Sequence, residues 1–371
     1  MSYKALYRKY RPVKFSDIIG QKVIVDILKN SIKENKIGHA YLFSGPRGTG
    51  KTSTAKIFAS TVNCSNPING EKCGKCNSCL QIDNIDAIEI DAASNNGVDE
   101  IREIRNNVKL LPSMGKYKIY IIDEVHMLST GAFNALLKTL EEPPEHVIFI
   151  FATTEIQKIP LTVLSRCQKF EFKKISITDM NKILTKISKK ENIKIDSKAI
   201  NLISELSGGG LRDAINLLDQ ASSNVTNMIC KEDIYELSGM VPETDINKFI
   251  TFIINKDEKS SLNYINELYE KGKNITFFCE NLINILRKQI CYNAINQKDE
   301  SKDLIHIIKK YIDVLSKLKI ATNSKIVFEI YTIDLINQLS EKDNEITNTL
   351  IIEKREIMGE NVYKTSFEES K

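Results

Sequence analysis

The sequence predicts an α/β domain built on a parallel sheet, followed by a small helical domain and a third, all-helical domain. Short apolar segments alternate with amphipathic helical patterns from residue 18 to residue 172, which is typical of a parallel sheet covered by helices. The strand patterns stop near residue 176, and beyond Pro242 the pattern is helical throughout. A chain of 371 residues accommodates three such domains, predicted at 1–175, 176–241 and 242–371.

Five segments of the first domain have the length and composition of buried strands. They are AYLF (40–43), IEI (88–90), KIYII (118–122), VIFIFA (147–152) and KFEF (169–172). Three consecutive glycines at 208–210 break the helical pattern of the second domain. The third domain carries periodic apolar positions such as Phe249, Phe252 and Ile253, and the polar stretch from residue 361 is expected to be a loose tail.

The composition is that of a soluble globular protein, with 42% hydrophobic and 27% charged residues. The net charge of +4 is too small to indicate nucleic-acid binding by bulk electrostatics, so any DNA contact must be local. Residues 1–14 carry five basic and no acidic side chains, a run that either meets phosphate or forms a solvated arm. The longest dense apolar stretch, 147–152, is too short to span a membrane, and the N-terminus lacks an export signal, which predicts a cytoplasmic protein.

A glycine-rich run follows the first predicted strand and leads into a helix predicted from Lys51 to about Val62. This is the context that a phosphate-binding loop requires. Its glycines let backbone N–H groups converge on phosphates, Lys51 bridges the β- and γ-phosphates, and Thr52 offers a hydroxyl to Mg²⁺. The predicted ATP-binding residues are Gly45, Pro46, Arg47, Gly48, Thr49, Gly50, Lys51, Thr52 and Ser53.

Two acids end the apolar strand at 119–122. Asp123 is predicted to hold Mg²⁺ together with Thr52, and Glu124 to orient and polarise the attacking water. Two acids after a strand usually form a solvated strand end. Beside a phosphate-binding loop, they indicate ATP hydrolysis.

Four further motifs give the sequence a family resemblance. The segment DEVHMLSTGAFNALLKTLEEPP (123–144) resembles the Walker B region of clamp-loader ATPases of the AAA+ type, and ATT (152–154) falls at their sensor 1. Ser165-Arg166-Cys167 matches their SRC motif, and GGGLRDA (208–214) matches sensor 2. The resemblance implies that Thr154 senses the γ-phosphate, that Arg166 acts in trans on a neighbour's ATP, and that Arg212 reaches the γ-phosphate of its own site.

Two N-terminal motifs extend this resemblance. YRKYRP (7–12) and DIIGQ (17–21) are similar to the family segment that packs near the adenine. All of these motifs occur in the family's order along the chain, with those from the phosphate-binding loop to sensor 2 covering about residues 39–214.

Four of the eight cysteines, Cys64, Cys73, Cys76 and Cys79, lie in an insert at 63–80. Their spacing suits a closed, tetrahedral Zn²⁺ site, and an iron–sulfur cluster is the alternative. The polar insert offers little apolar shielding for a cluster, which favours zinc. Clamp loaders of the bacterial tau/gamma type have a zinc module at this point, whereas the archaeal and eukaryotic types lack it. Disulfides are not expected in a reducing compartment.

The resemblance implies a function in DNA replication. A subunit of this family uses ATP to load the sliding clamp onto primer-template DNA, in a hetero-oligomeric, pentameric ring with other clamp-loader subunits of the DNA polymerase III holoenzyme. It would act at the nucleoid, with the third domain as an oligomerisation collar and no polymerase active site. In length, the chain resembles the short form, or domains I–III, of subunits of this family.

Two alternatives remain at this point. One is another AAA+ motor, such as a branch-migration or initiator ATPase, which the SRC motif and the cysteine insert argue against. The other is a ring member that binds no nucleotide, which Lys51, Thr52, Asp123 and Glu124 argue against.

Overall fold

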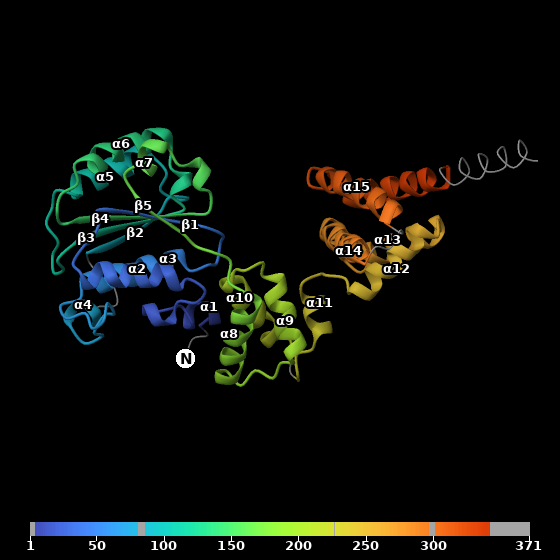
Figure 1. The fold of residues 1–371 in the computed structure, drawn as a ribbon, viewed down its shortest axis with the longest axis horizontal. Helices are drawn as coiled ribbons and strands as arrows, with labels where there is room; N and C mark the ends of the chain where they lie inside the picture. Colours follow the sequence, from blue (N-terminus) through green and yellow to red (C-terminus); the bar gives the residue numbers. More distant parts are fainter. Residues whose placement is uncertain (1–3, 81–85, 226, 297–300, 342–371) are drawn as a thin grey trace, which may run out of the picture. The chain divides into compact units, whose positions relative to one another are not determined.

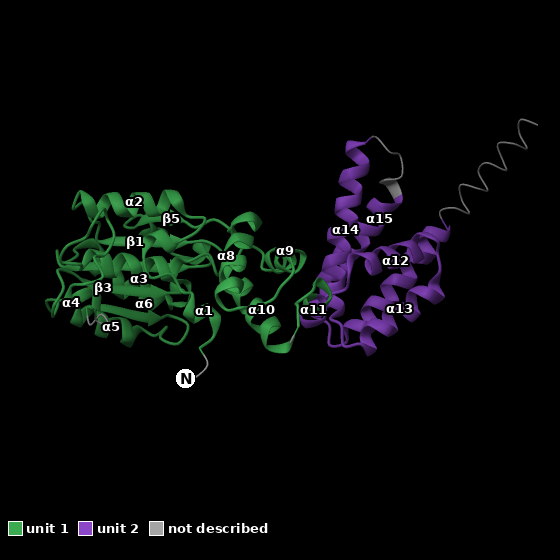
Figure 2. Ribbon diagram, turned by 90° about the horizontal axis from the view of Figure 1, so that it is seen from below, with its two compact units in different colours: residues 1–234 green, residues 235–371 purple. Residues whose placement is uncertain are grey.

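The computed structural model describes residues 4–80, 86–225, 227–296 and 301–341. The chain divides into two compact units, residues 1–234 and 235–371 (Figure 2). The first unit contains both the sheet and the short helices predicted as a second domain, and the division into three domains stays a prediction. The tail predicted from residue 361 lies outside the described residues.

A five-stranded sheet forms the centre of the first unit, with strand order β2-β3-β4-β1-β5. All four pairs of neighbouring strands are parallel, as predicted. The strands are β1 (Ala40–Ser44), β2 (Ala87–Asp91), β3 (Lys118–Asp123), β4 (Val147–Thr153) and β5 (Gln168–Glu171). Each contains the segment predicted for it or all but the last residue of that segment, so the fold class is confirmed.

Helices cover both faces of the sheet (Figure 1). On one face lie α5 (Val98–Asn107), α6 (Thr130–Glu141) and α7 (Leu161–Leu164), and on the other α2 (Lys22–Lys33) and α3 (Lys51–Val62). Strand β4 is buried along its whole length: Phe149 and Phe151 pack in the first layer, and Ile148 and Ile150 in the second. Burial on both faces explains why this strand is a continuous apolar run and not an alternating one.

Short helices complete the first unit. At the N-terminus are α1 (Leu6–Lys9) and the 3-10 turn η1 (Phe15–Asp17); α4 (Asn77–Leu80) lies in the cysteine insert. The turns η2 (Val125–Met127) and η3 (Ile156–Lys158) follow β3 and β4. The lid predicted after the sheet consists of α8 (Ile177–Lys190), α9 (Ser197–Leu206), α10 (Leu211–Asn224) and α11 (Lys231–Leu237), the last of which crosses the boundary between the units.

All the regular secondary structure among the described residues of the second unit is helical, as predicted. It contains α12 (Glu243–Ile254), α13 (Glu258–Glu270), α14 (Ile275–Ile295), α15 (Ser301–Leu318) and a helix over residues 324–341. Its core includes the rings of Phe249, Phe278, Tyr311 and Phe328, with neighbouring centroids 5.3–5.9 Å apart. Across the part of the chain that the structure describes, no helix is both long and apolar enough to cross a membrane.

Candidate nucleotide-binding site and cysteine cluster

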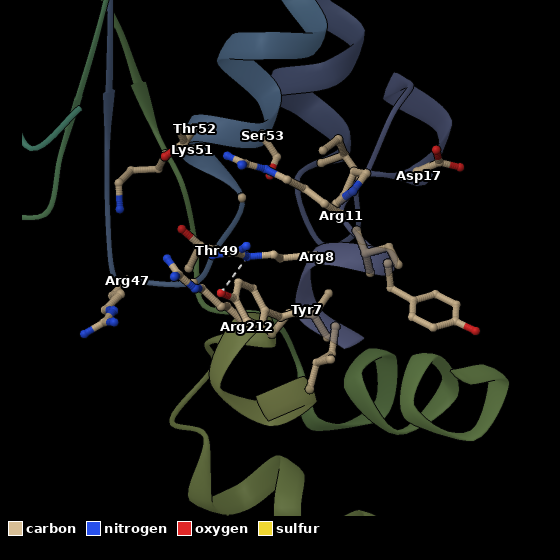
Figure 3. A pocket seen from close by; sticks show the side chains of 18 of the residues that line it. Tyr7, Arg8, Arg11, Asp17, Arg47, Thr49, Lys51, Thr52, Ser53 and Arg212 are labelled. Atoms are coloured by element: carbon tan, nitrogen blue, oxygen red, sulfur yellow. Dashed lines mark hydrogen bonds between the residues drawn. The ribbon is translucent and has the colours of Figure 1, made fainter. Parts of the chain in front are cut away.

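A cavity of about 640 Å³ opens where β1 and β3 end and the lid begins. Ligands of parallel α/β sheets bind at this edge, outside the carboxyl ends of the strands. The cavity joins segments that are far apart in the sequence: the N-terminal residues, the glycine-rich loop, the end of β3 and the start of α10 (Figure 3). The predicted site residues that line it are Arg47, Gly48, Thr49, Gly50, Lys51, Thr52, Ser53, Asp123, Glu124 and Arg212.

Two glycines fix the path of the loop. Gly45 and Gly48 have φ angles of 137° and 76°, which residues with a Cβ rarely adopt. A Cβ on Gly45 would lie 2.3 Å from the carbonyl oxygen of Phe172, and one on Gly48 would lie 2.9 Å from the Cα of Gly210. The glycines therefore allow the loop to lie directly against the end of β5 and against the lid.

Lys51 and Thr52 begin α3, close to the acid that ends β3. The Lys51 side chain is buried, and its Nζ donates hydrogen bonds to the carbonyl oxygens of Gly45 (2.8 Å) and Pro46 (3.0 Å). Burial lowers the pKa of Lys51, while the negative charges of Glu124 and Asp123 oppose that shift. Thr52 Oγ1 donates to Asp123 Oδ2 at 2.7 Å, so the two predicted Mg²⁺ ligands are adjacent.

Glu124 follows β3 with a left-handed backbone, at φ 45°. The N–H and the hydroxyl of Thr154 both donate to its Oε2, at 3.2 and 3.1 Å. Thr154 thus contacts Glu124 from the end of β4 and is not among the residues lining the cavity. Its predicted contact with a γ-phosphate stays a prediction.

The lid meets the phosphate-binding loop through the triple glycine. The Leu211 N–H donates to the Gly48 carbonyl oxygen at 3.0 Å, and α10 starts at this contact. Arg212, in the first turn of α10, lies over the Tyr7 ring with its guanidinium carbon 5.1 Å from the centroid (Figure 3). The sequence predicts a helix break here but not the close contact between the lid and the phosphate-binding loop. That contact depends on glycine in both segments, at Gly48 and Gly210.

The N-terminal segment contacts both the lid and α3, while its five basic side chains are exposed. The Leu6 N–H donates to Asp219 Oδ2 at 3.0 Å, and Lys9 forms an ion pair with Glu191 at 2.7 Å; both acids belong to the lid. Arg11 Nε donates to Ser53 Oγ in α3 at 3.3 Å. Family resemblance placed this segment near the adenine, but its pairing with the lid has no signal in the sequence.

Arg166 lies between α7 and β5 and is not among the residues lining the cavity of its own chain. Its guanidinium donates to Glu141 Oε1 and to the Thr162 carbonyl oxygen, each at 2.7 Å. A third of the side chain is exposed. The arginine is thus held in place on the surface of the first unit.

The four cysteines of the insert meet in one cluster, with all four Sγ atoms within 4.8 Å of one another. Two pairs, Cys64 with Cys76 and Cys73 with Cys79, are 3.9 and 4.0 Å apart. The backbone N–H groups of Lys75 and Cys76 donate to Cys73 Sγ and lower the pKa of that thiol. All the cysteines of the described residues are free.

Glu71 attaches the insert to the N-terminal half of the domain. Its carboxylate accepts from the N–H groups of Phe15 and Ser16, each at 3.0 Å, and forms an ion pair with Lys29 at 2.6 Å. The insert therefore packs on η1 and α2, beside the segment that leads to the cavity.

Known proteins match both halves of the first unit. Residues 20–176 match the family model described as DNA polymerase III, delta subunit, and residues 179–224 match the ATPase lid domain of a DNA polymerase III clamp loader subunit. The DNA polymerase III subunit gamma of Buchnera aphidicola (subsp. Baizongia pistaciae) is 41% identical over 322 residues, which cover 85% of this chain and 87% of that protein. The chain belongs to the gamma/tau family of DNA polymerase III clamp-loader subunits.

The chain also matches a longer member of the gamma/tau family. Subunit tau of Bacillus subtilis is 50% identical over 297 residues, which cover 79% of this chain and 53% of that protein, so the chain spans about half of its length. Among solved structures, the Thermotoga maritima RuvB Holliday junction branch migration motor is 19% identical, with a TM-score of 0.49, over 66% of this chain and 79% of that chain. Membership in the gamma/tau family confirms the resemblance seen in the motifs and decides against the alternative motors.

Proposed function

We propose that this chain hydrolyses ATP to ADP and phosphate and uses the cycle to load a sliding clamp onto primer-template DNA. The observation that carries the ATPase proposal is the single cavity that brings together the phosphate-binding loop, the Thr52–Asp123 pair, Glu124 and the lid residue Arg212. Family membership supports the clamp, the primer-template DNA and the other clamp-loader subunits as partners, and DNA replication in the cytoplasm, at the nucleoid, as the setting.

The side chains of the cavity divide the chemistry among them. Backbone N–H groups at the start of α3, together with Lys51, bind the phosphates of ATP. Thr52 and Asp123 are suited to hold Mg²⁺, which supplies charge neutralisation on the phosphate oxygens. Glu124 accepts a hydrogen bond from the attacking water and turns it toward the γ-phosphorus. This division of roles is what the sequence predicted for these residues.

Two arginines would then stabilise the charge that develops on the γ-phosphoryl oxygens. Arg212 acts within its own site, since it lines the cavity. Arg166 acts on the site of a neighbouring subunit, since it lies on the surface and away from its own cavity lining. Hydrolysis in this scheme requires a ring, for which we propose a hetero-oligomeric pentamer.

The second unit is the proposed collar of that ring. The last two of its described helices expose several isoleucines, and apolar side chains of this kind are what an assembly interface would cover. The exposed fractions are 38% for Ile305, 54% for Ile312, 50% for Ile326 and 57% for Ile330. Ile305 and Ile312 are seven residues apart in α15, which is two helical turns, so they lie on the same face of the helix.

The test of the function is ATP-dependent retention of a labelled sliding clamp on primed circular DNA by the reconstituted loader. We expect retention with ATP and none without it. The variant Ile312→Glu with Ile330→Glu should bind ATP normally but elute as a monomer and load no clamp, because charges on the collar face oppose assembly. A loader that retains no clamp with ATP would contradict the function; a charge variant that still assembles would contradict the collar alone.

We also propose that the four-cysteine cluster holds Zn²⁺ in a structural site. Zn–S bonds of about 2.3 Å in a tetrahedron place the sulfurs about 3.8 Å apart, close to the 3.9 and 4.0 Å of the two pairs. An iron–sulfur cluster holds its thiolates around several metal ions and needs a wider cage. The closed set of four ligands leaves no open position for chemistry.

Purified protein is expected to contain one zinc ion per chain, measured by elemental analysis. Cys76→Ser should lose most of this zinc and loosen the insert, while ATP binding and the unfolding of the sheet change little, because the insert lies outside the sheet core. Cys291→Ser, at an exposed cysteine outside the cluster, is the matched control and should keep its zinc. Iron with visible absorbance, or no metal, would overturn the assignment.

A further inference from the structure

A histidine with a largely buried side chain lies beside Glu124 and has no role in the scheme above. His126 belongs to the turn η2, directly after β3, and only 7% of its side chain is exposed. Its Nδ1 is 3.0 Å from Thr153 Oγ1 and 3.4 Å from Glu124 Oε2. Its Nε2 is 3.4 Å from Glu155 Oε1. The ring therefore lies between two carboxylates, one of which is the proposed water-orienting group.

The two oxygens of Glu124 are in different surroundings. Oε2 accepts both hydrogen bonds from Thr154 and faces the His126 ring. Within the described residues, Oε1 accepts no hydrogen bond. Since Glu124 lines the cavity, the carboxylate has one oxygen held by the protein and one left for water.

The groups that hold the histidine are themselves fixed. Thr153 is fully buried at the end of β4, and its Oγ1 also accepts from the Glu155 N–H at 3.0 Å. Lys158 in turn donates to Glu155 Oε1 at 3.0 Å. His126 thus connects the end of β4 to the end of β3. At the end of β3, Glu124 has a left-handed backbone, a conformation that is uncommon for glutamate.

We propose that His126 is a positioning residue for Glu124. In the tautomer that carries its proton on Nδ1, the N–H faces both Thr153 Oγ1 and Glu124 Oε2 and keeps Oε2 on the side of the Thr153–Glu155 turn; this directs Oε1 into the cavity toward the attacking water. The role deepens the proposed ATPase function and rests on it. A histidine that merely fills a buried gap would be replaced without loss by an apolar ring of similar size.

Three substitutions separate the two nitrogens. His126→Phe keeps a ring and removes both ring nitrogens; His126→Asn keeps an amide nitrogen near the position of Nδ1; His126→Gln keeps one near the position of Nε2. We expect His126→Phe to lower kcat of the assembled loader by about 10- to 100-fold, as misplacement of a catalytic group by an ångström does. The Kd for ATP should change little, because no phosphate-binding residue is touched. His126→Asn should recover most of the lost turnover, and His126→Gln little of it.

His146→Phe is the matched control. This histidine lies just before β4, where its Nε2 is 3.0 Å from the Val108 carbonyl oxygen, and its loss should leave kcat unchanged. Wild type and Glu124→Gln are assayed beside the variants: if wild type hydrolyses no ATP, or Glu124→Gln hydrolyses it normally, the proposed function fails. If those two behave as expected, the positioning role is overturned by a His126→Phe kcat within twofold of wild type, or by equal kcat values for the Asn, Gln and Phe variants.

Discussion

Arg166→Ala is expected to remove nearly all ATP hydrolysis from assembled rings, by about 10³- to 10⁵-fold, the range that arginine fingers supply in nucleotidases. The reason is that an arginine stabilises negative charge on the γ-phosphoryl oxygens in the transition state, more than in bound ATP. The isolated subunit should bind ATP almost normally, because Arg166 does not line the cavity of its own chain. The measurement is steady-state hydrolysis in the presence of the clamp and primed DNA, with ATP affinity determined separately.

Arg212→Ala is the matched control for that experiment. Arg212 lines the cavity and stacks on Tyr7, so its loss should weaken ATP binding in the isolated subunit, where Arg166→Ala has no effect. Arg166→Ala also removes the ion pair with Glu141, which could affect assembly. Native mass spectrometry therefore has to show that the variant still forms rings. Weak ATP binding by isolated Arg166→Ala subunits would argue for a role in its own site.

Lys51→Ala and Glu124→Gln are expected to separate binding from turnover. Lys51→Ala should weaken ATP binding by about 10²-fold, since a charged hydrogen bond contributes up to about 3 kcal/mol. Glu124→Gln should bind ATP normally and lower kcat by about 10²- to 10⁴-fold, the usual contribution of a positioned general base. The glutamine keeps the shape of the side chain and an oxygen for the two hydrogen bonds from Thr154.

Titration with a fluorescent ATP analogue measures the binding, and single-turnover hydrolysis measures the chemistry. Thermal unfolding of both variants is measured as a control for folding, and their unfolding midpoints should lie near that of wild type. The control matters most for Lys51→Ala, because Lys51 is buried and donates to two carbonyl oxygens of its loop. Equal loss of affinity in the two variants would contradict the separate roles.

Much of the fold could be predicted because local patterns determine it. Strand β4 is an apolar run in the sequence because it is buried on both faces. The glycine-rich loop is recognisable as phosphate-binding because its glycines and Lys51 are adjacent in the sequence and act on the same phosphates. The cysteine cluster is predictable for the same reason: its ligands are close in the sequence, from Cys64 to Cys79.

The contacts that join distant segments could not be predicted. His126 contacts Glu155 because β3 and β4 are neighbours in the folded sheet, and the Leu6 N–H contacts Asp219 because the N-terminal helix packs on the lid. Arg212 was assigned by its motif, but its stacking on Tyr7 depends on the position of the N-terminal helix. A single sequence records the residue types at such contacts but not which of them meet.

Mixed rings test most directly the claim that the chain is a ring ATPase whose sites are completed by neighbours. Arg166→Ala subunits keep an intact Lys51 site, and Lys51→Ala subunits keep an intact Arg166. In rings that hold both, some interfaces join an intact site to an intact arginine. We predict that mixtures recover clamp- and DNA-stimulated hydrolysis that neither parent shows, with a maximum at intermediate ratios. No recovery at any ratio, with mixed rings confirmed by native mass spectrometry, would contradict action in trans.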